Sequence, residues 1–143
     1  MAQDSMGSSH FQVEWGGARL GFSEISGISM STEIIEYREG AEKEDSYRKI
    51  PGLKRYGNIV LKRGITAGDN EFYAWFNTIA FGTVERRDIS ISLLNANHEP
   101  VMSWKIRDAF PVKLEIPSLK ANASEIAIES LEIACNGITV ENE

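Results

Sequence analysis

The chain is poor in the residues that build reactive or metal-binding sites. Its 143 residues include one cysteine, two histidines and four prolines. A disulfide needs two thiols, so Cys135 alone excludes an intramolecular bridge and favours folding in a reducing compartment. His10 and His98 lack the spacing to a cysteine or to another histidine that zinc ligands show. We therefore predict no metal site and no disulfide framework.

Catalytic patterns are also missing. Cys135 stands in an apolar strand pattern, which is typical of a buried thiol and not of a nucleophile. The carboxylates of Glu125, Glu129 and Glu132 follow one strand, where charged residues usually mark a solvated face. The 64–68 region has glycines but lacks the lysine and spacing of a phosphate-binding loop. We predict no catalytic residue, no cofactor-binding site and no enzyme activity.

Long apolar runs and a positive charge balance are absent as well. No segment approaches the roughly 20 apolar residues that span a bilayer, and no signal-peptide pattern is visible near the N-terminus. The net charge of −6 argues against a general nucleic-acid binder. With 42% hydrophobic residues, we expect one domain over 1–143 with a flexible segment at 1–9, made in the cytoplasm and not inserted into a membrane.

Most of the sequence alternates with the period of a β-strand. Gly16 and Gly17 separate two short strand patterns and predict a hairpin between them. The NANHEP turn at 95–100 predicts a second hairpin, in which Ile89 and Ile91 face inward on one strand and Trp104 and Ile106 on the other. The fold class predicted from these patterns is mainly β.

The last strand pattern changes phase. Ile126 and Ile128 share one parity, whereas Leu131, Ile133 and Cys135 share the other. A β-bulge near 129–130 reconciles the two, because one extra residue moves later side chains to the opposite face. The alternative is that both faces are partly buried there. The residues leave these two interpretations open.

One short helix is predicted at about 67–81, with Thr66 or Asp69 as its N-cap and Gly82 at its end. The aromatic and aliphatic residues within it recur at helical spacing and form one apolar stripe. That stripe is expected to pack on a sheet and is made of Phe72, Trp75, Phe76 and Ile79.

A long charged segment at about 39–55 shows neither period, and we predict it to be a loop. Structureless loops longer than about 12–15 residues are uncommon and are often functional. Acidic residues lead this segment and basic ones follow, which suits a complementary protein surface better than a polyanion. We expect Pro51 and Gly52 to turn it back toward the sheet. The predicted subunit-interface residues are Glu42, Glu44, Asp45, Arg48, Lys49, Pro51, Lys54 and Arg55.

An ordered series of motifs resembles the phage tail-tube family, which includes the inner-tube proteins of contractile phage tails, R-type pyocins and extracellular contractile injection systems. The motifs are YREG at 37–40, PGLKRYGNIVLKRGIT at 51–66, FYAWF at 72–76, RDISISLLNANHEPVMSWKIRDAFPVKL at 87–114 and IAIESLEIACNGI at 126–138. They cover nearly all of the chain from Phe11 onward. Phe110 and Asn136 depart from residues that the family often shows.

The resemblance implies a β-barrel or sandwich-like tail-tube fold and a structural subunit without catalysis. It implies homohexameric rings that stack into a tube inside a contractile sheath. The implied partners are the sheath protein, the baseplate hub and spike, tube-terminating proteins and a cargo of effector, tape-measure protein or DNA. The mature protein is expected in a phage tail or a phage-tail-like particle.

The strand pattern also predicts a lumen-facing polar row of Ser29, Ser31 and Glu33, although an ordinary solvent-exposed face has the same pattern. Two other functions stay open. One is a baseplate or tube-initiator relative that caps the tube, and the other is a monomeric β-barrel that binds a small molecule.

Overall fold

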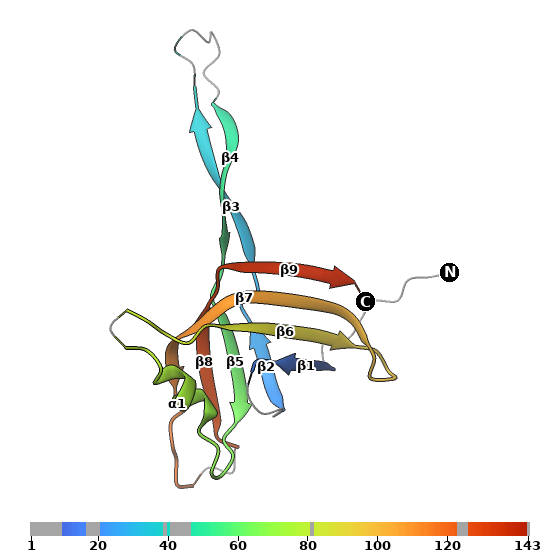
Figure 1. Cartoon of the computed structure of the whole chain (residues 1–143), viewed down its shortest axis with the longest axis vertical. Coiled ribbons are helices and arrows are strands. Elements are labelled where there is room, and N and C mark those ends of the chain that lie inside the picture. Colours follow the sequence, from blue (N-terminus) through green and yellow to red (C-terminus); the bar gives the residue numbers. More distant parts are fainter. Residues whose placement is uncertain are drawn as a thin grey trace.

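The computed structural model describes residues 10–16, 21–38, 40, 47–80, 82–122 and 126–142. Its elements in chain order are β1 Phe11–Glu14, β2 Phe22–Ser26, β3 Met30–Tyr37, β4 Arg48–Tyr56, β5 Ile59–Gly64, α1 Glu71–Phe76, β6 Arg87–Leu94, β7 Pro100–Glu115, β8 Ile128–Ala134 and β9 Gly137–Asn142 (Figure 1). In this described part, the one helix is far too short to cross a bilayer. The predicted mainly β class is confirmed.

Two groups of strands form the body of the molecule, and β7 belongs to both. The antiparallel path runs β1-β6-β7-β8-β5-β2, and β9 pairs with the first half of β7. The ends of this path, β1 and β2, do not pair with each other in the described residues, so the sheet is not closed into a barrel. The long β7 passes from the β6 side to the β8 side, which folds the sheet over a shared interior.

The core lies between these two groups of strands. Alternate residues of β5, β6 and β8 are buried, as period-two patterns require when one face of each strand is covered. Figure 1 shows α1 beside one end of the sheets. The fully buried apolar core includes Trp15, Ile59, Leu61, Phe72, Trp75, Ile106, Ala109, Leu131 and Ile133.

The predicted hairpin around the NANHEP turn is confirmed, since β6 and β7 pair in antiparallel register with Ile91 opposite Trp104. The hairpin predicted at Gly16 and Gly17 is wrong. β1 pairs with β6 and β2 pairs with β5, at opposite ends of the sheet. Residues 17–20, which connect the two strands, lie outside the described residues. Two adjacent glycines indicate a change of chain direction, but they do not specify that the strands on either side pair with each other. Here β1 and β2 each pair with another strand.

The predicted helix is longer than the observed one. It begins at Glu71 and ends at Phe76, with Asn77 at its C-cap, so Gly82 does not end it. Its N-cap is Asn70, so the predicted N-caps Thr66 and Asp69 were wrong. The carboxylate of Asp69 nevertheless accepts the backbone N–H of Glu71, the first helical residue, at 3.0 Å.

Within the predicted apolar stripe, Phe72 and Trp75 are fully buried and Phe76 packs against the core. Ile79 lies past the helix end and is exposed, so its place in the core stripe was wrong.

The last strand pattern needs no bulge. β8 pairs with β5 in unbroken register from Ile128 to Ile133, and the irregularity opposite it lies in β7 between Pro111 and Lys113. Ile126 and Ile128 change parity because they lie on the exposed face. The buried parity continues through Glu129, whose carboxylate meets a buried arginine.

The described part of the segment predicted as a loop at 39–55 is largely a strand. β4 begins at Arg48 and pairs with β3 along its whole length, and these two strands form a separate two-stranded sheet. Residues 39 and 41–46 lie outside the described residues. Pro51 and Gly52 do not turn the chain, because they lie inside β4 where its register shifts by one residue. Proline is tolerated at such a site because both strands of a two-stranded sheet are edge strands.

Candidate assembly surfaces

The two-stranded sheet β3–β4, hereafter the ribbon, projects from the body along the longest axis of the molecule (Figure 1). Directly opposed residues of an antiparallel pair lie on the same face, and successive pairs alternate between faces. Ile35 opposes Ile50 and Tyr37 opposes Arg48, which places these four on one face. Ile34 opposes Pro51 on the other face. We call these the Ile35 face and the Ile34 face.

Both faces of the ribbon expose large apolar side chains. Ile34 is 63% exposed on its face. Met30, four residues before Ile34 on β3 and closer to the body, lies on the same face. Ile35 is 52% exposed, and Ile50 and Tyr37 are exposed beside it. Leu53, at the register shift, is 72% exposed. Clustered exposed apolar residues of this kind mark surfaces that are covered by another molecule.

The charges of the ribbon lie mostly on β4. Arg48, Lys49, Lys54 and Arg55 are all exposed, as is Pro51. Arg55 forms an ion pair with Glu33 across the ribbon, and Glu36 opposes Lys49. The structure therefore brings the five described residues of the predicted interface together on one strand. Glu42, Glu44 and Asp45 of the same prediction lie outside the described residues.

The predicted lumen row does not form a purely polar face. Ser31 and Glu33 lie on the Ile35 face of the ribbon, where Ile35 and Tyr37 continue the same row. Ser29 precedes β3, and its carbonyl accepts the backbone N–H of Gly57 at 3.0 Å. The lumen-facing role of these residues stays a prediction.

The base of the ribbon is built from close backbone contacts. Gly27 follows β2 with a φ of +87°, and a Cβ at this position would collide with the carbonyl oxygen of Asn58. Gly57 ends β4, and a Cβ there would collide with the hydroxyl of Ser29. The two crossings between body and ribbon thus pass close together, and glycine is required at position 27, where the backbone of Asn58 leaves no room for a Cβ.

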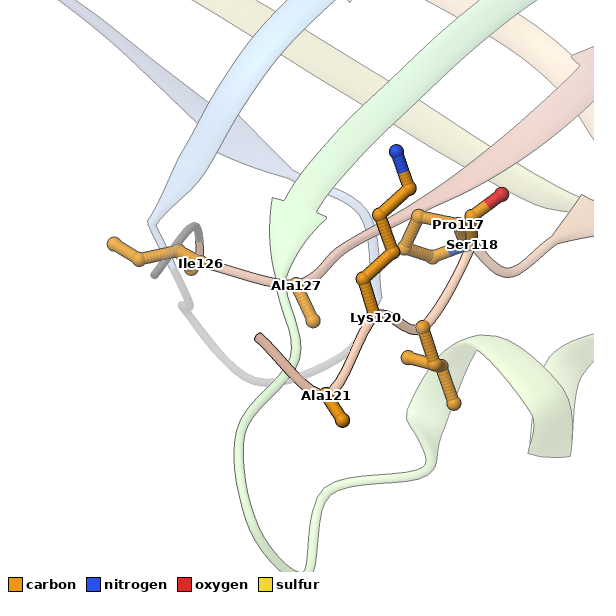
Figure 2. A pocket seen from close by; sticks show the side chains of 7 residues that line it. Pro117, Ser118, Lys120, Ala121, Ile126 and Ala127 are labelled. Carbon is orange, nitrogen blue, oxygen red and sulfur yellow. The ribbon is translucent and has the colours of Figure 1, made fainter. Parts of the chain in front are cut away.

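The opposite end of the molecule carries a second apolar surface, the foot, made of Ile65, Ile116, Leu119 and Ile126. Leu119 and Ile126 are 78% and 79% exposed. Figure 2 shows a pocket in this region, lined by 117–121, Ile126 and Ala127. The backbone N–H of Ile65 donates to the carbonyl of Ala127 at 2.9 Å, which ties the end of β5 to this surface. Sequence reasoning missed the foot, although the apolar residues Ile116 and Leu119 on either side of Pro117 were a signal in the sequence.

Three strand edges of the body have no partner on one side within the described residues. β1 pairs with β6, β2 with β5 and β9 with β7, each on one side alone. The outer end of β9 is exposed, with Val140 46% exposed. Unpaired edges present backbone N–H and C=O groups that readily pair with another chain.

A buried arginine links the strands to α1. Arg63 of β5 is 2% exposed, and its guanidinium donates to Glu129 at 2.8 Å and to both oxygens of Asp69 at 3.2 Å. It also lies 4.1 Å from the ring centre of Phe72. Because Asp69 accepts the backbone N–H of Glu71 at the start of α1 and Glu129 belongs to β8, this cluster links α1 to β5 and β8.

The sequence has few side chains of the kinds that most often act as nucleophiles or metal ligands, one cysteine and two histidines. Burial raises the pKa of the Cys135 thiol, and a hydrogen bond from the backbone of Gly137 offsets this in part, so the thiol stays protonated at neutral pH. His10 and His98 stack on each other with ring centres 5.4 Å apart. Within the described ranges, no three metal-ligating side chains come together. The surfaces of this molecule are suited to binding other protein surfaces.

A family model described as "T4-like virus tail tube protein gp19" matches residues 7–139. The chain belongs to the tail tube protein family. The family resemblance of the sequence motifs is thereby confirmed. No curated protein matches the chain.

Chains in solved structures of contractile particles are similar to this tail tube chain. A chain in the cryo-EM structure of the anti-feeding prophage cap, the AFP tube terminating cap, is 33% identical with a TM-score of 0.91, covering 100% of this chain and 95% of that one. A chain in the sheath-tube complex of PVC, an extracellular contractile injection system in its extended state, is 31% identical with a TM-score of 0.88, covering 97% and 93%.

A chain in the six-fold symmetrised AFP baseplate has a TM-score of 0.82 at 22% identity, covering 99% of this chain and 98% of that chain. At that identity the likeness shows the fold alone. The tail-tube fold is thus shared with structures of a tube, a cap and a baseplate.

Proposed function

We propose that this tail tube protein is a structural subunit of the inner tube of a contractile phage-tail-like injection system. Six copies form a ring, rings stack around a lumen, and the tube conducts cargo when the sheath contracts. The observation that carries the proposal is the ribbon, a two-stranded sheet with exposed apolar residues on both faces. The subunit does no chemistry, and its role is the shape and strength of the assembly.

Self-association follows from the surfaces. The ribbon and the foot lie at opposite ends of the longest axis (Figure 1), so a contact between them is head-to-tail. Repeated head-to-tail contacts build rings when the rotation closes and open filaments when it does not. The open edges of β1, β2 and β9 offer the lateral contacts that a ring needs.

The proposed partners are inferred from the particles in which the similar chains occur. Chains above 30% identity occur in structures of a sheath-tube complex and a tube cap, which supports contacts with a sheath protein and with tube-terminating proteins. A baseplate hub and spike at the other end of the tube follow from the same proposal. Cargo of effector, tape-measure protein or DNA would pass through the lumen. Assembly takes place in the bacterial cytoplasm, and the mature protein lies in the particle.

Negative-stain electron microscopy of the purified chain tests this proposal. We expect six-fold rings or hollow tubes at high protein concentration. A variant in which a short glycine-serine turn replaces residues 31–55 is expected to keep the circular dichroism spectrum of a β-protein but to form no tubes. A chain that stays strictly monomeric at high concentration would overturn the proposal.

A second candidate is a protein that caps the tube. It is favoured by the TM-score of 0.91 to a chain of the tube terminating cap structure. The two candidates differ in their effect on growing tubes of the same particle. A tube subunit is incorporated along the tube and lengthens it, whereas a cap added in substoichiometric amounts shortens the average tube measured by electron microscopy.

The third expectation, a small-molecule barrel, has no observation in its favour. The core residues Ile59, Leu61 and Leu131 are fully buried and fill the interior.

A further inference from the structure

The two histidines of the chain lie side by side at one end of the body. His10 precedes β1, and His98 belongs to the turn between β6 and β7. Their rings stack with centres 5.4 Å apart, and both residues are exposed. The sequence contains no further histidine. Both of its imidazoles therefore belong to one contact, which we call the histidine pair.

The turn between β6 and β7 constrains the position of His98. The side-chain oxygen of Asn95 accepts the backbone N–H groups of Asn97 and Glu99 at 2.9 and 3.0 Å. The carbonyl of Asn95 accepts the backbone N–H of His98 at 3.0 Å. His98 has a φ of +59°, a conformation that is uncommon outside glycine but that histidine adopts more often than most residues. The ring is thus presented by a closed, hydrogen-bonded turn.

The other ring belongs to the start of a short edge strand. β1 has four residues and pairs with β6 alone in the described part of the chain. Its far end is anchored, because Val13 and Trp15 are buried in the core. At its start, the carbonyl of His10 accepts the backbone N–H of Leu94 at 2.9 Å. This hydrogen bond and the ring contact hold His10 against the β6–β7 hairpin.

Protonation changes the charge of the ring contact. Histidine is the side chain whose ordinary pKa, about 6.5, lies between pH 5 and 8, whereas burial raises the pKa of the Cys135 thiol away from this range. Two protonated rings carry like charges 5.4 Å apart, and like charges at this spacing repel each other. Mild acid therefore makes the contact repulsive.

The charges around the histidine pair offset one added proton and not two. Glu99 follows His98 in the turn and is exposed, so one carboxylate is at hand. The other charged residues on the strands that pack here lie further along those strands or beyond β7. They are Glu14 on β1, Arg87 and Asp88 on β6, those from Lys105 onward on β7, and Glu141 on β9 opposite Ser103. The second protonation is the one that opposes the contact.

We propose that the histidine pair is a pH-sensitive latch on the start of β1. It holds His10 against the β6–β7 turn at neutral pH and releases it when both rings are protonated. The release is limited to the start of the strand, because Val13 and Trp15 remain buried. It frees the edge of β6 at Leu94, and unpaired strand edges readily pair with another chain. The latch acts within one subunit and is independent of the proposed function.

Amide hydrogen exchange of the full chain, resolved to single residues by mass spectrometry, tests the latch. The reporter is the amide of Leu94, and the reference is the amide of Asn136, which donates to the carbonyl of Arg107 at 3.0 Å. Sedimentation confirms the same assembly state at both pH values. After correction for the intrinsic effect of pH, we expect Leu94 in low salt to exchange about threefold faster at about pH 5 than at about pH 7.5. Asn136 should not change. Equal exchange of Leu94 at the two pH values would overturn the proposal.

Variants and salt separate repulsion between the rings from other effects of acid. His10→Gln and His98→Gln each leave one ring, so the difference between the two pH values should vanish in both. Asn97→Gln alters the same exposed turn but keeps both rings, so the difference should remain. About 1 M salt should abolish it in the unmodified chain, because the Debye length is then about 3 Å, shorter than the 5.4 Å between the ring centres. A difference that persists in both single-histidine variants, or in high salt, would overturn the latch.

Discussion

The body and the ribbon use similar residues in opposite ways. In the body, Leu61 and Ile133 point into a shared interior and are fully buried. In the ribbon, Leu53 and Ile34 lie in strands of comparable composition and are mostly exposed. The body therefore buries the apolar residues that stabilise the subunit, whereas the apolar residues of the ribbon are exposed in the single chain and available for the contacts proposed above.

The largest effect on the body is expected from Arg63→Ala. The substitution leaves the carboxylates of Glu129 and Asp69 buried without their partner. Breaking one side of a buried ion pair costs about 3–5 kcal/mol, so we expect the free energy of unfolding to fall by that amount in urea titrations.

The adjacent Lys62→Ala is the matched control. Lys62 pairs with Glu24 at 3.2 Å on the surface, where both side chains are substantially exposed. Exposed pairs contribute about 0–1 kcal/mol, so this variant should unfold nearly as the unmodified chain does. Equal decreases in the free energy of unfolding from the two variants would show that the Arg63 cluster does not stabilise the body more than a surface ion pair does.

Two leucines compare body and ribbon directly. Leu61→Ala opens a cavity in the core and is expected to lower the free energy of unfolding by about 2–5 kcal/mol. Leu53→Ala removes an exposed side chain from the ribbon and should change it by less than about 0.5 kcal/mol. Thermal unfolding of both variants at a concentration where the chain is monomeric measures the difference. A large loss from Leu53→Ala would mean that the ribbon packs on its own body.

Much of the body was predictable from the sequence because its strands are covered on one face. The strict alternation in β6 and β7 predicted their pairing, and the helical spacing of Phe72 and Trp75 predicted their burial. These patterns are local, and the chain itself supplies the covering surface.

The ribbon was mispredicted because neither of its faces is buried in the described part of the chain. With apolar residues on both faces, β3 and β4 lack a single buried row, and Pro51 and Gly52 add signals that are typical of a turn. The missing bulge in β8 has a related cause, since Glu129 is buried by its pairing with Arg63 from another strand. Sequence spacing does not report such long-range partners.

A glycine pair tests how the ribbon is held to the body. Gly27→Ala forces a residue into a positive φ and pushes its Cβ against the carbonyl of Asn58. Backbone strain of this kind costs about 1–3 kcal/mol. Gly21→Ala is the control, because the space around that position is open and its φ is not positive. Chemical denaturation should separate the two variants, and equal stabilities would refute a tight crossing at the base.

A small effect on folding and a large effect on assembly are expected from charge reversal on β4. Lys54→Glu and Arg55→Glu place carboxylates on the basic strand, which then repels the acidic surface of another copy. We expect fewer rings or stacks by electron microscopy while the subunit stays folded, with a change of less than about 1 kcal/mol in unfolding because both sites are exposed.

Arg55 needs one more variant, because it also pairs with Glu33 within the ribbon. The exchange Glu33→Arg with Arg55→Glu restores an ion pair across β3 and β4 and keeps the net charge. If Arg55 acts through a neighbouring copy, the exchanged variant remains poor in assembly, since the positive charge has moved to the other strand. If the pair acts only to brace the ribbon, the exchange restores tubes of normal length. Tubes of normal length from the Lys54→Glu, Arg55→Glu double variant would show that the charges of Lys54 and Arg55 do not contribute to the assembly contact.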